Sequence, residues 1–352
     1  MEDKIADFLI VGQGLAGTIL ANRLLSEGKT VQIVADTEGG ASSIAAGVIN
    51  PVTGRRIVKS WRYEEFYAAA KTVYQDLEKE YHIKVWHDFN ILRTLKNAED
   101  ENKWTVRSSW AEYVPYCLPD ADPSVFAGKI KEFYGFGEIT TAAQVDIPQI
   151  IDFFKEKWLQ NGILINEPFD FESLIIEENN AQYKHIQADK IIFAEGAKGV
   201  KNPYFSYLPF NVDKGECLII EIKNADFDKI FKNNIAIVPL SKKDHFWVGG
   251  TSEWDATHVM PTPEKRLSME TELRNILTVD FKITAHQAAI RPSVKDRRPM
   301  IGVHPKFLNV FIFNGFGTKG ASLIPFWASH LVEVLENKTE IDGEVDILRF
   351  LK

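Results

Sequence analysis

The feature that most constrains the fold is a glycine-rich turn near the start of the sequence. Residues 8–11 are continuously apolar, which is typical of a parallel strand buried on both faces. The next six residues read G-x-G-x-x-G and lead into a helical pattern. In such a turn Gly12 permits the tight bend, Gly14 lets a pyrophosphate approach the backbone, and Gly17 lets the helix pack closely on the strand. The sequence therefore predicts a nucleotide-binding strand and helix.

The residues that follow complete a strand–helix–strand unit. The helical pattern ends at Gly28, a second apolar strand covers residues 30–35, and this strand ends at Asp36. A carboxylate at that point can accept hydrogen bonds from the ribose hydroxyls of an adenosine, while the positive end of the helix faces the phosphates. A glycine-rich turn without a nucleotide is the alternative. The presence of the first strand, the helix, the second strand and the terminal acid in the expected order and spacing favours a dinucleotide. The residues expected to contact it are Gly12, Gly14, Leu15, Ala16, Gly17, Asp36 and Thr37.

The composition narrows the classes of function that are open to this chain. Lys plus Arg number 41 and Asp plus Glu 49, so the formal net charge of −8 argues against broad binding to the phosphate backbone of nucleic acids. Cys117 and Cys217 stand a hundred residues apart without metal-like spacing, which predicts buried free thiols and no metal site. The sequence shows no apolar stretch long enough for a transmembrane segment and no secretory leader, so we expect a cytoplasmic protein.

The segment after Asp36 carries a second signature. It reads S-x-x-A-A-G-x-x-x-P, with small residues that let a planar ring lie against the backbone. This pattern resembles the D-amino acid oxidase and glycine oxidase family of FAD-dependent amine oxidoreductases, in which the segment runs along the flavin. A small-residue packing helix is the alternative. The resemblance implies cofactor contacts by Ser42, Ser43, Ala45, Ala46, Gly47 and Val48.

Polar residues directly beyond this segment are candidates for the reaction site. Asn50 follows within a few residues, and Arg55 and Arg56 come next. If the preceding segment touches the flavin, one of these arginines can help to attract an anionic substrate. A charge run on a solvated face is the alternative, and it is the better interpretation of Lys59 and Arg62.

A second glycine-rich turn, N-G-F-G-T-K-G-A-S, opens a helix near the end of the chain. An NAD-binding domain has no need of such a turn, whereas in the family this helix points its positive end at the pyrimidine side of the flavin. Lys319 would add positive charge there or face solvent. The resemblance implies cofactor contacts by Gly315, Gly317, Thr318, Lys319, Gly320, Ala321 and Ser322.

The stretch A-x-R-P-x-x-x-D-x-x-P-x-I-G, around Arg291, is similar to glycine oxidase and to the FAD-dependent half of a bifunctional tRNA wobble-uridine modifying enzyme. The resemblance implies that Arg291 holds the substrate carboxylate, a role suited to the planar guanidinium fork. An interdomain salt bridge is the alternative. Trp247 is a pocket candidate, and Ala236 stands where the amino acid oxidases keep an active-site tyrosine.

The expected fold is α/β: a Rossmann-like FAD-binding domain with an interleaved α+β substrate domain on a mainly antiparallel sheet. The FAD-binding domain is expected at residues 1–82, 138–205 and 300–352, and the substrate domain at 83–137 and 206–299. Further local predictions are a helix over 63–81, a strand over 85–95, irregular structure over 96–137, and a helix ending before Gly162 with Leu159 on its buried face. The resemblance also implies that Phe169 or Phe171 packs beside the adenine, with core packing as the alternative, and that Gly196 lies near the cofactor phosphates.

The resemblance implies oxidation of a C–N bond in an amino acid or secondary amine that carries a carboxylate. The neutral amine would deliver a hydride to flavin N5, the imine would hydrolyse, and oxygen or a quinone would accept the electrons. Two alternatives remain open: a tRNA wobble-uridine modifying oxidase, and a non-catalytic flavoprotein subunit.

Overall fold

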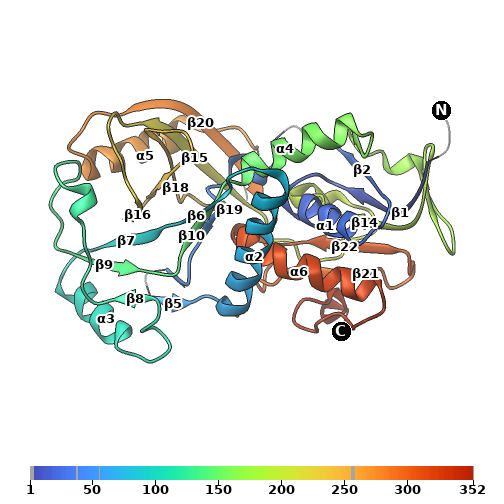
Figure 1. Ribbon diagram of the computed structural model, residues 1–352, viewed down its shortest axis with the longest axis horizontal. Helices are drawn as coiled ribbons and strands as arrows, with labels where there is room; N and C mark the ends of the chain where they lie inside the picture. The colour runs from blue at the N-terminus through green and yellow to red at the C-terminus, as the bar shows by residue number, and fades with distance from the viewer. Residues whose placement is uncertain (1–3, 37–38, 55, 255–257, 352) are drawn as a thin grey trace. The chain divides into compact units, whose positions relative to one another are not determined.

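The computed structural model describes residues 4–36, 39–54, 56–254 and 258–351. It divides into two compact units, and the chain passes repeatedly between them (Figure 1). Unit 1 comprises Met1–Ala45, Ile147–Asp213 and Ile290–Lys352, and unit 2 comprises Ala46–Asp146 and Lys214–Ala289. Residues 46–82 thus belong to unit 2, where the sequence had placed them in the cofactor domain. The helix in this segment, α2 (Tyr63–Tyr81), packs on a unit 2 strand, with Tyr74 stacked on Trp86 at 6.2 Å.

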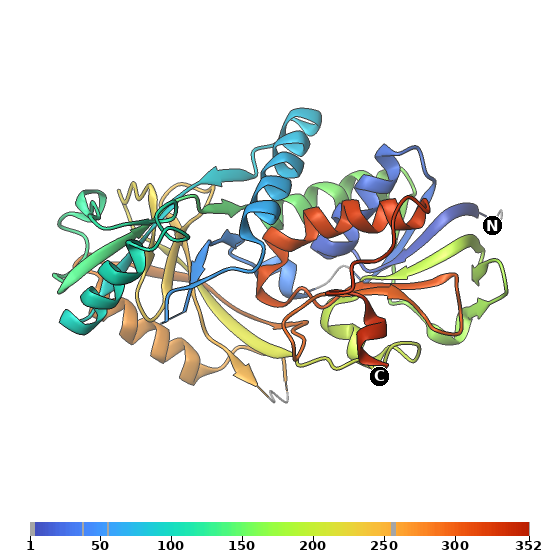
Figure 2. The same ribbon diagram turned by 90° about the horizontal axis from the view of Figure 1, so that it is seen from below.

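Unit 1 is built on a mostly parallel sheet. Its parallel strands are β1 (Lys4–Val11), β2 (Val31–Ala35), β11 (Leu164–Asn166), β14 (Ile186–Phe193) and β22 (Val310–Asn314). Antiparallel additions are β12 (Leu174–Ile176), β13 (Ala181–Tyr183) and β21 (Met300–Val303). The helices α1 (Leu15–Ser26), α4 (Ile147–Gln160) and α6 (Gly320–Leu335) lie on one side of this sheet, as Figure 2 shows. The predicted α/β class and its Rossmann-like unit are confirmed.

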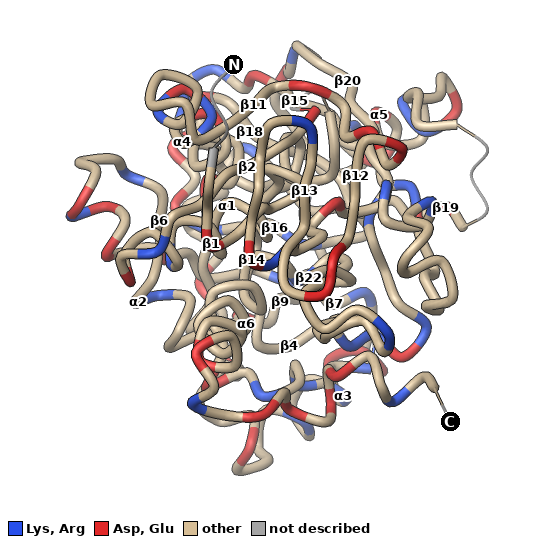
Figure 3. Tube along the Cα trace, turned by 90° about the vertical axis from the view of Figure 1, so that its right-hand side faces the viewer, with Lys and Arg blue, Asp and Glu red and all other residues tan. Residues whose placement is uncertain are grey.

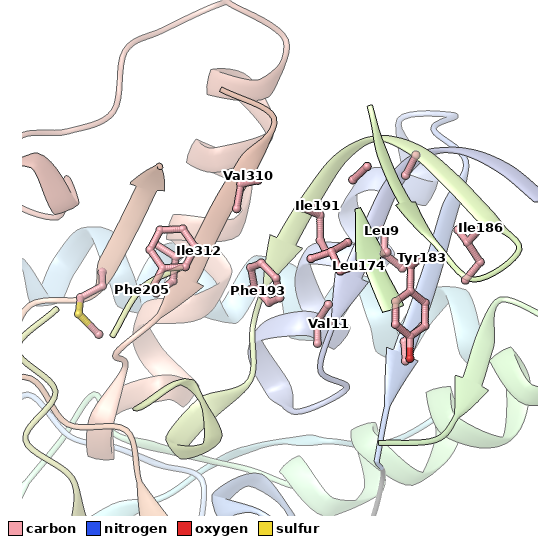
Figure 4. Close-up of a cluster of buried hydrophobic side chains, with 14 of the residues drawn as sticks. Leu9, Val11, Leu174, Tyr183, Ile186, Ile191, Phe193, Phe205, Val310 and Ile312 are labelled. Atoms are coloured by element: carbon pink, nitrogen blue, oxygen red, sulfur yellow. The ribbon is translucent and has the colours of Figure 1, made fainter. Parts of the chain in front are cut away.

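The core of unit 1 explains why the strands are so apolar. Side chains from β1, β13, β14 and β22 form one buried cluster, in which Leu9, Ile191 and Phe193 are fully inaccessible (Figure 4). Both faces of the central strands are covered, which requires the continuous apolar runs seen in the sequence. Phe169 packs at the edge of this cluster, stacked on Tyr183 at 4.4 Å.

Unit 2 is built on a larger, mainly antiparallel sheet in the order β19-β15-β18-β17-β16-β7-β9-β8, with β20 on β15. Its strands are β7 (Asn90–Leu95), β8 (Cys117–Leu118), β9 (Gly135–Ile139), β15 (Asp213–Glu221), β16 (Lys229–Lys232), β17 (Ala236–Pro239), β18 (His245–Gly249), β19 (Glu253–Trp254) and β20 (Lys282–Arg291). Smaller pairings join β3 (Val48–Ile49), β10 (Ala143–Val145) and β6 (Trp86–Asp88), and join β4 (Val52–Thr53) to β5 (Val58–Lys59). The helix α5 (Pro263–Ile276) shares a hydrophobic cluster with the strands of the large sheet.

Three local predictions need correction. The segment expected to be irregular contains α3 (Ala98–Ser108), which begins where the Asn97 side chain accepts a hydrogen bond from the Asp100 amide. The single strand expected over 85–95 is divided into β6 and β7, which join different sheets. Leu159 is 40% exposed, because the buried face of α4 runs through Ile147, Ile150, Ile151, Phe154 and Trp158.

Other expectations on composition can be compared with the structure. Both cysteines are buried free thiols, as predicted. Acidic and basic positions are distributed along the whole trace instead of gathering in one stretch (Figure 3). Within the part of the chain that is described, the helices are too short or too polar to cross a lipid bilayer.

Candidate cofactor and substrate site

Three glycine turns of unit 1 follow three adjacent parallel strands. Val11 at the end of β1 pairs with Phe193 at the end of β14, and Phe193 pairs with Ile312 near the end of β22. The turns after these strands contain Gly12, Gly196 and Gly315. Because parallel strands in register end at the same edge of a sheet, the three turns share that edge, which is where open α/β sheets bind ligands.

The first turn is shaped so that only glycine fits. Gly12 adopts a φ of 110°, and a Cβ built there would lie 2.5 Å from the carbonyl oxygen of Ala194. A Cβ on Gly17 would lie 2.0 Å from the carbonyl oxygen of Gly12. The helix α1 therefore starts directly against the strand, and its N-cap, Gly14, has no side chain to satisfy the first amides. This arrangement leaves a cradle for an anion, which fits a pyrophosphate.

Two serines of the short 3₁₀ helix η1 (Ala41–Ile44) have different roles. The Ser42 hydroxyl oxygen accepts a hydrogen bond from the Leu15 amide at 3.0 Å, so it lies at the start of α1 beside the cradle. The Ser43 hydroxyl donates to the carbonyl oxygen of Gly40 at 2.9 Å, within its own turn. Ala45 and Ala46 follow and are half-buried. Of the two predicted serines, Ser42 is thus the one adjacent to the first glycine turn.

A buried asparagine that sequence reasoning missed connects the second and third turns. The Asn314 side-chain amide donates to the carbonyl oxygen of Gly196 at 2.9 Å, and its oxygen accepts from the Gly315 amide at 2.8 Å. Asn314 is 2% exposed, and its only sequence signal is its place between an apolar strand and a glycine turn. Both hydrogen bonds hold backbone, so Asn314 fixes the spacing of the two turns.

The second turn also carries a partly buried acid, Glu195. Burial raises the pKa of Glu195 to about 7, although an amide hydrogen bond from Asn202 at 2.6 Å favours the charged form. Lys198, a few residues later, forms an ion pair with Asp36 at 2.8 Å. This pair ties the end of β2 to the second turn. Asp36 retains its predicted position after β2, whereas Thr37 lies outside the described residues.

The third turn lies next to the strand end that carries Arg291. Gly315 and Gly317 adopt φ values of 81° and 54°, and the Gly317 amide donates to the carbonyl oxygen of Pro292 at 3.1 Å. Lys319 is largely buried at the start of α6, and its pKa is lowered by burial and by the charges of Arg298 and Arg297. The turn continues through Thr318 and Gly320 to Ala321 and Ser322, whose hydroxyl donates to the Lys319 carbonyl at 3.0 Å.

Arg291 is held by an acid within unit 1. Its Nη1 lies 2.7 Å from Asp213 Oδ2, and Ser293 donates to the other carboxylate oxygen, Oδ1, at 2.7 Å. The Asp213 side chain is 4% exposed, while that of Arg291 retains 20%. An ion pair of this kind fixes the plane of the guanidinium. Both residues belong to unit 1, so this ion pair lies within that unit.

Several predicted site residues belong to unit 2, and residues of that unit fix their positions. A Cβ on Gly47 would lie 1.8 Å from the carbonyl oxygen of Val145, and Val48 begins β3 directly after it. The side-chain oxygen of Asn50 accepts from the Val52 amide at 2.9 Å, which shapes the start of β4. Arg56 is exposed on the turn between β4 and β5, and Arg55 lies outside the described residues. The ring of Trp247 lies over Gly249, 2.4 Å from where a Cβ would stand.

The donor set around the first turn is suited to a dinucleotide and shows no sign of a metal centre. Gln13, between two of the glycines, has a buried Oε1 without a hydrogen-bond partner among the described residues. No group of three or more His, Cys, Asp or Glu side chains in the described part of the chain is arranged to hold a metal ion. The amides at the start of α1, of which Ser42 accepts only that of Leu15, and the close glycine packing beside them together fit the pyrophosphate of a dinucleotide.

Comparisons with known proteins agree with a dinucleotide cofactor. The family described as "FAD dependent oxidoreductase" matches residues 7–334. A glycine oxidase from Pseudomonas aeruginosa is 22% identical over 368 residues, covering 95% of each chain. Among solved structures, glycine oxidase from Geobacillus kaustophilus has a TM-score of 0.79 at 18% identity and covers 99% of this chain and 98% of its own. Iminodiacetate oxidase from Chelativorans sp. BNC1 has a TM-score of 0.80 at 19% identity, and the match covers 96% of this chain and 97% of that protein.

Proposed function

This chain belongs to the family of FAD-dependent oxidoreductases, and we propose that it oxidises a carbon–nitrogen bond in an amino acid or secondary amine that carries a carboxylate. The observation that carries the proposal is the placement of Arg291. Asp213 fixes its guanidinium, and the adjoining Pro292 is hydrogen-bonded to Gly317 in the third glycine turn. The relatives named for glycine and iminodiacetate support the same class of substrate.

FAD, the cofactor of this family, would be held mainly by unit 1. The amides at the start of α1 would bind the pyrophosphate, Asp36 the ribose, and the edge around Phe169 the adenine, where its ring already stacks on Tyr183. The remaining predicted contacts are Ser42, Ala45, Ala46, Gly47, Val48, Gly196 and the third turn. When bound, the flavin supplies the two-electron redox chemistry that no protein side chain offers.

Arg291 would bind the substrate carboxylate and so orient the carbon that bears the nitrogen. Its guanidinium plane is set by Asp213, and Ser293 holds Asp213 in turn. A guanidinium fixed in this way does not have to be ordered when the substrate arrives, which lowers the entropic cost of binding. Asn50, Arg56 and Trp247 are the unit 2 residues that we propose as further substrate contacts.

Positive charge gathers at the start of α6. The first helical amides are directed at the third turn, and Lys319 adds a largely buried amino group. This end of unit 1 would therefore favour an electron-rich group beside it, as the pyrimidine side of a flavin becomes on reduction. The electron acceptor, oxygen or a quinone, and a cytoplasmic location complete the proposal.

The test is an anaerobic flavin-reduction screen across amino acids, N-methyl amino acids and imino acids. We expect some of these compounds to bleach the flavin, and we expect Arg291→Ala to lower kcat/KM by about 100-fold, as the loss of a charged bidentate contact of roughly 3 kcal/mol predicts. Arg291→Lys is the matched control and should recover only part of the loss.

Other outcomes separate the alternatives. An Arg291→Ala effect below about threefold contradicts a role in carboxylate binding. Reduction by no amine in a broad panel favours a non-catalytic flavoprotein, which the absence of the family tyrosine at Ala236 keeps open. Reduction only by a carboxymethylaminomethyl nucleoside would identify a tRNA-modifying oxidase, which the acidic composition disfavours.

A further inference from the structure

An ion pair within unit 1 joins the two strand ends on either side of β1. The order of the parallel strands is β11-β2-β1-β14, so the end of β1, where the first glycine turn starts, lies between the ends of β2 and β14. Asp36 directly follows β2, and Lys198 belongs to the short 3₁₀ helix η4 (Gly196–Lys201) after β14. The Lys198 ammonium group lies 2.8 Å from Asp36 Oδ2.

The span of this pair places it beside the first glycine turn. Neighbouring strands are about 4.8 Å apart, so two strands that share a neighbour end about 10 Å apart. A lysine and an aspartate side chain bridge that distance here with a direct hydrogen bond. A cofactor held by the turn from Gly12 to Gly17 would therefore lie next to the pair, with its ribose on the side of β2.

Both side chains of the pair are accessible to a ligand. The side chain of Asp36 is 35% exposed and that of Lys198 is 62% exposed. An ion pair this open contributes little to stability, because water and salt screen it. A carboxylate can accept about four hydrogen bonds, so one bond from Lys198 does not exhaust its capacity for the hydroxyls of a ribose.

Lys198 also brings a positive charge to a second acid, Glu195. Burial raises the pKa of Glu195, while the hydrogen bond from Asn202 and the charge of Lys198 act in the opposite direction. The backbone of Glu195 adjoins the first turn, since a Cβ on Gly12 would lie 3.2 Å from its Cα. Carboxylates at this edge repel a pyrophosphate, and the charge of Lys198 offsets that repulsion.

We propose that Lys198 is a positioning residue for the cofactor: it holds the Asp36 carboxylate in place for the adenosine ribose and offsets its charge beside the pyrophosphate. This inference rests on the proposed function for the identity of the cofactor, and it is independent of the amine that is oxidised. A carboxylate that is already held loses less side-chain freedom when the ribose binds. Lys198 thus acts through Asp36.

The experiment compares the release of two flavins from the loaded full-length protein. One is FAD, and the other is its analogue built on 2′-deoxyadenosine, which lacks one ribose hydroxyl. Each loaded protein is diluted, and the fluorescence of the released flavin gives a dissociation constant. We expect the native protein to bind FAD about tenfold more tightly than the analogue, as a hydrogen bond to a charged acceptor predicts.

Substitutions then show whether Lys198 supports this preference. Asp36→Ala should abolish it, and Lys198→Met should reduce it to about threefold, because the carboxylate is no longer held. Lys198→Arg keeps the charge and should retain most of the preference. Lys201→Met, at an exposed position of the same 3₁₀ helix, is the matched control and should leave the preference unchanged.

Several results would overturn the inference. One is a native preference below about twofold, and another is a Lys198→Met protein with the native preference. An equal loss of affinity for both flavins would mean that the pair only ties the second turn to β2, since such a tie does not distinguish a hydroxyl from a hydrogen. Tighter binding of FAD by Lys198→Met would mean that the pair closes the site against the cofactor.

Failure of the proposed function gives a different result. If the activity alone is wrong, the hydroxyl preference and its response to the substitutions at Lys198 persist, while no amine reduces the flavin. Protein that takes up no FAD would contradict the proposed function and this inference together.

Discussion

The two units achieve specificity by different means. In unit 1 the candidate cofactor site is made of backbone, because the glycines after β1 and β22 stand where a Cβ would collide with neighbouring atoms, and the glycine after β14 leaves open space. In unit 2 charged side chains on neighbouring strands, such as Arg93 and Lys232, are brought together by register. Positions where only glycine fits can be recognised from a few adjacent residues in the sequence. Strand register, by contrast, depends on how distant segments of the chain pair.

The largest expected effect on cofactor binding comes from breaking the backbone cradle of unit 1. In Gly17→Ala the new Cβ would lie 2.0 Å from the carbonyl oxygen of Gly12, so either the helix or the strand end must move. We expect FAD binding to be lost or weakened by at least about 100-fold, because the start of α1 no longer meets the pyrophosphate. Fluorescence titration of the apoprotein with FAD would measure this.

Gly28→Ala is the matched control for this substitution. Gly28 also adopts a positive φ of 76°, but nothing lies within 4 Å of the added Cβ. The change should cost about 1 kcal/mol of stability and leave the affinity for FAD unchanged. If both variants bind FAD as the native protein does, steric closeness at Gly17 is not what makes the site.

A substitution in unit 2 tests whether its sheet depends on paired side chains. The ammonium group of Lys214 lies 3.0 Å from Glu216 Oε1, and both side chains are 1% exposed. The hydroxyl of Thr262 also donates to this carboxylate, and His286 Nε2 lies 2.8 Å from it. Glu216→Gln leaves a buried lysine without its counter-ion, so we expect the free energy of unfolding to fall by about 4 kcal/mol.

Chemical denaturation followed by tryptophan fluorescence would measure the loss. Glu112→Gln, at an exposed position of the same unit, is the matched control and should change stability by less than about 0.5 kcal/mol. A Glu216→Gln protein as stable as the native one would show that the strands of unit 2 hold their register without this charge pair.

The sequence predicted the features that depend on neighbouring residues and missed those that depend on the pairing of distant strands. The glycine turns, the bounds of α2 and the α/β class were all accessible, because each depends on spacing within a few turns of chain. Asn314 was missed, since its role requires knowing that β14 and β22 are neighbours. The pairing of Arg93 with Lys232 was also missed, because the two strands are far apart in the sequence and meet only in the folded sheet.

The last of these effects depends on pH and tests how closely the second turn of unit 1 is packed. Burial raises the pKa of Glu195 from its ordinary value of 4.5 to about 7. The native state therefore binds a proton more tightly than the unfolded state, so stability falls as pH rises from about 4.5 through 7 and then levels off. The total cost above this window is about 3 kcal/mol. Glu195→Gln keeps an acceptor for Asn202 and carries no charge to bury.

We therefore expect Glu195→Gln to unfold at the same temperature as the native protein at pH 4.5, and at a higher temperature at pH 8. Thermal unfolding of the two proteins at intervals across this pH range, with saturating FAD throughout, would show the divergence. Glu156→Gln, on the exposed face of α4, should follow the native profile at every pH. Parallel profiles for Glu195→Gln and the native protein would mean that solvent reaches this carboxylate, and that the backbone around the second turn is packed less tightly than the cradle beside it.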